Sequence, residues 1–235
     1  MSAVLDVRGV TYRYPDGTDA LTGATFALAT GERTALLGPT GAGKSTLLQL
    51  LNGLLRPASG AVVVCGLPVD DANVAEVRRR VGLVFQNPDD QLFLPSLLED
   101  VAFGPLNAGA SPEDAERRAH AVLHALGLDG AHDRAAHHLS GGERRLAALA
   151  TVLVSEPSLL VLDEPSGDLD ARSRRRLRGI LQDRREALLV ATHDLEFVRG
   201  LCSRALVLVN GRLAFDGGLE DLLGDGERLE GFGLV

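Results

Sequence analysis

The chain has 235 residues, of which 45% are hydrophobic and 24% charged, enough for one substantial core with a smaller subdomain. Its formal charge is -8, and its short arginine clusters at 78–80 and 172–178 form no continuous basic stripe, so we predict no nucleic-acid partner. Cys65 and Cys202 stand apart in apolar surroundings without metal-ligand spacing, which argues against a disulfide framework.

The chain opens with a pattern typical of an antiparallel hairpin. Residues 4–14 alternate between polar and apolar side chains and predict an edge strand, residues 15–17 predict a turn, and residues 24–28 predict the returning strand.

A glycine-rich loop follows the apolar run 34–37 and contains the only lysine of the chain. It fits the pattern Gly-x4-Gly-Lys-Ser and consists of Gly38, Pro39, Thr40, Gly41, Ala42, Gly43, Lys44 and Ser45. Leucines recur at helical spacing directly after it. Converging backbone N–H groups, a helix N-terminus and one lysine charge together bind phosphate. The loop therefore predicts a nucleotide site, with Ser45 reaching Mg²⁺.

Three further apolar runs, at 81–85, 159–162 and 188–192, also end in polar side chains. The groups that follow them are Gln86, the pair Asp163 and Glu164, and His193. Ligands of open parallel sheets bind outside the carboxyl ends of the strands, so we expect all of these groups at one phosphate tail. Asp163 is placed to hold Mg²⁺, and Glu164 to polarise the water that attacks the γ-phosphate.

Between the apolar runs at 81–85 and 159–162, the pattern becomes helical. We predict helices at 97–103, 112–126 and 143–155, broken by Pro105, Gly109 and Pro112. The predicted fold is therefore one α/β domain over 1–235: a nucleotide-binding core at 1–87 and 156–220, a helical subdomain at 88–155, and a tail of uncertain order at 221–235.

Ser140 and Glu143 are spaced as a capping box at the start of the third predicted helix. A cap alone would explain them. The same helix end, fronted by Gly141 and Gly142, is also able to bind an anion. A chain with two phosphate-binding helix ends leads to the hypothesis that two chains face each other head to tail around two nucleotides.

Together these motifs resemble the ATP-binding cassette (ABC) ATPases, whose signature is Leu-Ser-Gly-Gly followed usually by Gln. The resemblance covers nearly the whole chain and implies the P-loop ABC-ATPase fold, a mostly parallel sheet with an N-terminal antiparallel β subdomain and an inserted helical subdomain. It implies ATP and Mg²⁺ as cofactors. It implies that Tyr14 stacks on adenine, that Thr46 belongs to the nucleotide-binding residues and that His193 contacts the γ-phosphate. It also implies that Gln86 links Mg²⁺ and the attacking water to the membrane partner and that Asp170 is the D-loop acid. Ser140, Gly141 and Gly142 would act on the ATP of the opposite subunit.

The segment 86–93 is similar to the Q-loop and Q-helix of energy-coupling-factor transporter ATPases. This resemblance implies a transmembrane coupling subunit docked on Asp89, Gln91 and Phe93, a substrate-binding membrane subunit, and a bacterial, peripheral location on the cytoplasmic face of the membrane. The stretches 99–105, 137–143 and 191–196 are most similar to the cobalt and nickel importers of the CbiO type, with cobalt ranked first. The ATPase is expected as a homodimer, or as a heterodimer with a related ATPase.

Two positions depart from the family pattern: Glu143 replaces the usual Gln, and Asp168 stands where the D-loop often has a small residue. The alternatives are an ATPase of an iron-sulfur assembly scaffold, an importer of biotin or another vitamin, and a nucleotide-binding regulator without turnover. His120 and His124 are four residues apart on a predicted helix, a spacing that suggests metal storage, but no Cys or carboxylate completes an obvious ligand set.

Overall fold

The computed structural model describes residues 3–235, which divide into two compact units. The first, here the sheet unit, runs from the N-terminal segment to Leu83 and adds Ser158–Glu164 and Arg185–Val235. The second, the helical unit, comprises Val84–Pro157 and Pro165–Arg184. It thus holds the predicted subdomain 88–155 together with a later helical segment that the sequence pattern does not group with it.

An antiparallel sheet opens the sheet unit, with its strands in the order β2-β1-β4-β5. The strands are β1 (Ala3–Arg13), β2 (Asp19–Ala29), β4 (Ser59–Val64) and β5 (Leu67–Pro68). The predicted hairpin is confirmed by the antiparallel pairing of β1 with β2. The prediction that its first arm is an edge strand is wrong, because β4 pairs with the other side of β1. That partner comes from some fifty residues later, and no local pattern announces it.

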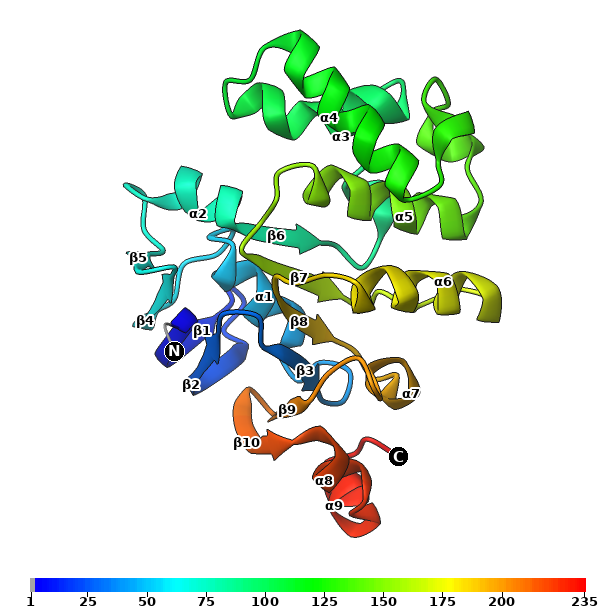
Figure 1. Ribbon diagram of the computed structural model, residues 1–235. Coiled ribbons are helices and arrows are strands. Elements are labelled where there is room, and N and C mark those ends of the chain that lie inside the picture. The colour runs from blue at the N-terminus through cyan, green and yellow to red at the C-terminus, as the bar shows by residue number, and fades with distance from the viewer. Residues whose placement is uncertain (1–2) are drawn as a thin grey trace. The chain divides into compact units, whose positions relative to one another are not determined.

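The second sheet has the strand order β10-β9-β3-β8-β7-β6 (Figure 1). The strands are β3 (Arg33–Leu37), β6 (Val81–Val84), β7 (Leu159–Asp163), β8 (Ala187–Ala191), β9 (Arg204–Val209) and β10 (Arg212–Gly218). Neighbours β7, β8, β3 and β9 run parallel, and their apolar runs are buried as in sheets covered on both faces. Ala191 pairs with Leu36 on one side and Asp163 on the other, so the carboxyl ends of β3, β8 and β7 share one edge, as predicted.

Helices α1 (Lys44–Leu51), α2 (Val74–Arg80) and α7 (Leu195–Val198) connect these strands. In α1 the leucines at helical spacing are buried, which anchors the helix directly behind the glycine-rich loop. The first arginine cluster forms the last turn of α2, where cations interact favourably with the helix dipole.

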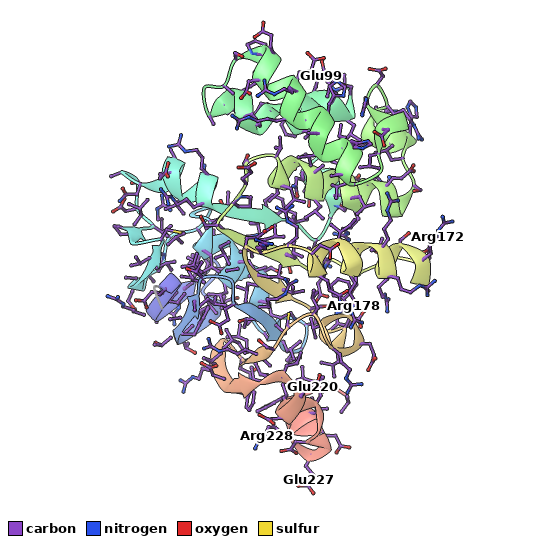
Figure 2. All side chains as sticks on the ribbon, viewed as in Figure 1. Glu99, Arg172, Arg178, Glu220, Glu227 and Arg228 are labelled. Atoms are coloured by element: carbon purple, nitrogen blue, oxygen red, sulfur yellow. The ribbon has the colours of Figure 1, made fainter. Side chains whose placement is uncertain are left out.

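The helical unit is built on α3 (Leu97–Asn107), α4 (Pro112–Ala125), α5 (Gly141–Leu153) and α6 (Ala171–Gln182), with 3₁₀ turns at Pro88–Asp90, Asp129–Ala131 and Ala136–His138. The prediction that Pro105 breaks a helix is wrong. Pro105 lies in the last turn of α3, where its missing N–H removes one intrahelical bond, and its ring is buried. Pro112 is the first residue of α4, in agreement with the predicted helix at 112–126, and this position suits proline. Arg172 and Arg178, labelled in Figure 2, project from α6.

The C-terminal tail, whose order its glycine-rich, acidic composition left open, forms two short helices. Residues Leu219–Leu223 form α8 and Gly226–Gly231 form α9. Leu219, Leu222 and Leu229 are buried, whereas Glu220, Glu227 and Arg228, labelled in Figure 2, are exposed. The guanidinium of Arg228 also lies over the ring of Phe215 of β10, 5.4 Å from its centroid. Within residues 3–235, the helices are too short and too polar for any of them to cross a membrane.

Candidate functional site

The glycine-rich loop has backbone conformations that only glycine adopts at low cost. Gly38 has φ +150°, and a Cβ atom there would lie 2.2 Å from the carbonyl oxygen of Leu208. Gly43, the N-cap of α1, has φ +101°, and a Cβ atom there would lie 2.4 Å from the carbonyl oxygen of Ala20. The loop is therefore tightly fitted against two neighbouring strands, and its backbone turns at the N-terminus of α1, where an anion is favoured.

Lys44 is held at the start of α1 with its side chain 9% exposed. Its ammonium group donates hydrogen bonds to the carbonyl oxygens of Gly38 (2.7 Å) and Pro39 (3.2 Å) and lies 3.9 Å from Oε1 of Glu164. Burial lowers the pKa of Lys44, and the carboxylates of Glu164 and Asp163 oppose that shift. The lysine thus stands between the loop and the acidic end of β7, where a phosphate would meet it.

Glu164 follows β7 and has an uncommon backbone conformation, with φ +44°. Its N–H donates to the carbonyl oxygen of Ala191 (2.8 Å), which ties it to the end of β8. Its Oε2 accepts a hydrogen bond from the Thr192 hydroxyl (2.9 Å) and lies 3.1 Å from Nδ1 of His193. The structure therefore brings together Lys44, Glu164 and His193 from the ends of three strands, as the sequence predicts.

Asp163 and Ser45 have the chemistry that Mg²⁺ requires. Asp163 is 7% exposed and ends β7, and Ser45 is the second residue of α1. A carboxylate and a hydroxyl are the oxygen donors that this hard cation takes, alongside water and phosphate oxygens. The residues present fit the ion, which would neutralise charge on the phosphates when bound.

Tyr14 and Thr46 are joined by a hydrogen bond between their hydroxyl groups (2.8 Å), and the Tyr14 ring makes an edge contact with Tyr12 at 5.0 Å between centroids. This arrangement fixes the ring beside α1. Adenine stacking by Tyr14 and nucleotide binding by Thr46 stay predictions.

The capping box of α5 is confirmed. Ser140 Oγ accepts from the N–H of Glu143 (3.3 Å), and the Glu143 carboxylate accepts from the N–H of Ser140 (2.8 Å). The hydrogen bonds from Ser140 lower the pKa of Glu143, so this carboxyl stays ionised at neutral pH. Ser140 and Gly141 are exposed, and a Cβ atom on Gly142 would lie 2.5 Å from the Ser173 hydroxyl.

Gln86 lies in the helical unit and its side chain is exposed. Its backbone is fixed by Arg145, which is 5% exposed and donates from Nη1 to the carbonyl oxygens of Gln86 (2.7 Å) and Phe85 (3.2 Å). Nη2 of the same guanidinium reaches the carbonyl oxygen of Gly167 at 3.5 Å. One arginine of α5 therefore joins the segment after β6 to the segment before α6. The sequence does not single out Arg145, because it is one of two adjacent arginines after the capping box and its burial appears only in the structure.

The three residues expected to face a membrane partner differ in orientation. Phe93 is 64% exposed, and Asp89 is exposed as well. Gln91 is turned inward: its amide nitrogen donates to Ala148 O (2.8 Å) and Thr151 Oγ1 (2.7 Å), and its Oε1 accepts from the N–H of Phe85 (3.1 Å). If Gln91 contributes to coupling, it does so by supporting the segment 86–93 and not by contacting the membrane partner.

Asp170 and Asp168 occupy the segment before α6. Asp170 is the N-cap of α6, with its Oδ1 accepting from the N–H of Ser173 (2.7 Å), and this bond lowers its pKa. Asp168 has φ +58°, a conformation that explains why a small residue suits this position. The role of Asp170 as the D-loop acid stays a prediction.

The histidines do not assemble a metal site in the described part of the chain. The ring of His120 packs on that of His132 at 4.5 Å between centroids, and His124 contacts Asp129 at 2.6 Å. Among residues 3–235, three or more His, Cys, Asp or Glu side chains nowhere gather in a group that could hold a metal ion.

Comparison with known proteins extends these observations. The family model of the ABC transporter matches residues 21–167. A putative ABC transporter ATP-binding protein of Streptomyces coelicolor is 53% identical over 95% of this chain and 86% of its own length. The energy-coupling factor transporter ATP-binding protein EcfA of Methanocaldococcus jannaschii is 40% identical over 96% of this chain and 83% of its own length.

Among solved structures, cbiO1 of Clostridium perfringens, part of the ABC transporter complex cbiONQ, superposes with a TM-score of 0.85 at 34% identity and covers 100% of this chain and 96% of its own. A dimeric ATP-binding cassette in a post-hydrolysis state, bound to ADP and Pi, superposes with a TM-score of 0.83 at 26% identity, covering 92% of this chain and 98% of its own. Residues 21–167 include the glycine-rich loop, the capping box of α5 and the acid pair after β7. The chain therefore belongs to the ABC transporter ATPases of the energy-coupling-factor and CbiO type, which bind ATP and couple its hydrolysis to transport.

Proposed function

We propose that this chain powers a bacterial energy-coupling-factor importer for a divalent transition metal, with cobalt first and nickel second. It pairs with a second copy, or with a related ATPase, around two ATP molecules, and it lies peripherally on the cytoplasmic face of the membrane against a transmembrane coupling subunit and a substrate-binding membrane subunit. The observation that carries the proposal is the exposed aromatic side chain of Phe93 on the segment that resembles the Q-helix.

In the proposed catalytic cycle, the glycine-rich loop and Lys44 hold the phosphate tail while Glu164 accepts a proton from the attacking water. His193 lies against Glu164 and contacts the γ-phosphate. Asp163 and Ser45 hold Mg²⁺, and Ser140 with its two following glycines acts on the ATP of the opposite subunit. We expect Glu164→Gln to lower ATP turnover by orders of magnitude and to prolong the life of the ATP-bound dimer. Turnover close to that of the wild type would overturn the role of Glu164.

The proposed docking surface consists of Phe93, Phe103 and Leu106, which are 64%, 41% and 43% exposed. The two rings make an edge contact at 5.3 Å between centroids. Beside them lies a mostly apolar groove of about 450 Å³ between α3 and the start of α4, with Glu99 and Glu116 on its lining. An apolar floor with two carboxylates fits an amphipathic helix that carries a basic residue, which is the chemistry expected of a coupling helix.

Covering the exposed part of the Phe93 ring would contribute about 1 to 2 kcal/mol, so its removal should weaken docking about tenfold. The test is affinity purification from detergent-solubilised native membranes, comparing wild type, Phe93→Ala and the control Leu54→Ala by quantitative mass spectrometry. Leu54 is a matched control because it is an exposed apolar residue, at 46%, that lies in the sheet unit. We expect integral membrane proteins with the wild type and the control and their depletion with Phe93→Ala.

Recovery of soluble partners alone in all three samples would overturn the importer assignment and favour an assembly scaffold. The ion is tested separately, by uptake of cobalt and nickel into cells with and without the chain. The resemblance of the stretches 99–105, 137–143 and 191–196 to cobalt and nickel importers supports cobalt, and loss of biotin uptake with unchanged metal uptake would contradict it.

A further inference from the structure

Thr192 is a fully buried residue directly after β8, and its side-chain hydroxyl contacts the carboxylate of Glu164. It donates to Oε2 of Glu164 (2.9 Å) and accepts from the N–H of Asp194 (3.0 Å), while the N–H of Thr192 donates to Leu36 O (3.1 Å). The residue thus connects β3, β8 and the loop that begins α7 to a single carboxylate.

Glu164 needs such a connection because its backbone is strained. A residue other than glycine keeps a φ of +44° only when several contacts with its surroundings restrain it there. The first restraint is the bond from its own N–H to Ala191 O. The second is the bond from the Thr192 hydroxyl, which fixes the far end of the side chain.

The two carboxylate oxygens of Glu164 consequently face different groups. Oε2 meets the Thr192 hydroxyl, the His193 N–H at 3.4 Å and His193 Nδ1 at 3.1 Å. Oε1 faces the Lys44 ammonium at 3.9 Å, toward the glycine-rich loop. Fixing Oε2 leaves Oε1 as the oxygen directed at the phosphate side, where an attacking water would stand.

We propose that Thr192 is a positioning residue for ATP hydrolysis: its hydroxyl orients Glu164 so that Oε1 receives the proton of the attacking water. The inference rests on the proposed role of Glu164. Water loses a proton to Oε1 as its oxygen bonds to the γ-phosphorus and the bond to the ADP oxygen breaks. Thr192 exchanges no proton in this step.

The test compares Thr192→Val, which keeps the shape and removes the hydroxyl, with Thr192→Ser, which keeps the hydroxyl. Thr34→Val is the matched control, because Thr34 is also fully buried in this sheet and its hydroxyl has no hydrogen-bond partner among residues 3–235. A lost hydrogen bond to a charged group predicts a kcat about 10- to 100-fold lower for Thr192→Val, with KM for ATP within about twofold. Thr192→Ser and Thr34→Val should stay within about threefold of the wild-type kcat.

A positioning role that acts through Glu164 is distinguished from a purely structural role of Thr192 by a double variant. Thr192→Val is introduced into the Glu164→Gln protein, and single-turnover ATP hydrolysis is measured. If the hydroxyl acts through the carboxylate, the second substitution lowers the remaining rate by no more than about twofold. The proposal is overturned if Thr192→Val retains wild-type kcat, if Thr192→Ser is as slow as Thr192→Val while both bind ATP normally, or if the Val substitution slows both backgrounds equally. Wild-type turnover of Glu164→Gln alone would instead overturn the proposed role of Glu164.

Discussion

Gln91→Ala should destabilise the helical unit, because the Gln91 amide makes three internal hydrogen bonds. The substitution removes two donated bonds, each worth about 1 kcal/mol, and leaves the N–H of Phe85 without its acceptor, which costs about 1 kcal/mol more at a half-buried position. The expected loss is about 3 kcal/mol. For a chain of this size, that corresponds to a thermal midpoint lower by roughly 6 to 12 °C.

The measurement is thermal unfolding of wild type, Gln91→Ala and Phe93→Ala, followed by hydrogen exchange at the Phe85 amide. Phe93→Ala is the matched comparison two residues away, since its ring is 64% exposed and its loss should change stability by no more than about 0.5 kcal/mol. Exchange at Phe85 should accelerate only in Gln91→Ala. If Gln91→Ala unfolds at the wild-type temperature and Phe85 stays protected, the support role of Gln91 is refuted, and a loss of partner in that variant would then report on docking alone.

Two further predictions concern acidic residues. Asp100 is 4% exposed and accepts hydrogen bonds from the N–H groups of Phe93 (3.0 Å) and Leu94 (3.1 Å). Burial raises the pKa of Asp100. Its contribution to the free energy of unfolding is therefore fully present below the ordinary aspartate pKa of about 4 and is lost as pH rises through the raised pKa. Asp100→Asn keeps the hydrogen-bond acceptor without the charge. The thermal midpoint of this variant should therefore rise relative to that of the wild type as the pH is raised from 4 to 7. A difference between the two midpoints that does not change with pH would contradict the raised pKa. At Asp168, φ is +58°, a backbone conformation that favours glycine. In urea unfolding, Asp168→Gly should be as stable as the wild type or up to about 1 kcal/mol more stable, and Asp168→Ala should be less stable. The reverse order would refute backbone strain at Asp168.

The sequence by itself determined the chemistry and the strands that carry it. The glycine-rich loop, the acid pair after β7 and His193 after β8 each follow an apolar run, and the sheet places the ends of those runs at one edge because neighbouring strands are parallel. The capping box of α5 was also predictable, since its two partners are three residues apart and need no tertiary information.

Other features depend on partners far apart in the chain. That β1 is an inner strand depends on β4, and that the C-terminal tail is helical depends on burial of leucines that its polar composition conceals. The orientation of Gln91 depends on Ala148 and Thr151 of α5, almost sixty residues away. Local spacing fixes which groups are present in a segment, because covalent geometry and helix or strand period act over a few residues. Which way a side chain such as that of Gln91 or Thr192 points is decided only when distant segments pack and each buried polar atom must find its partner.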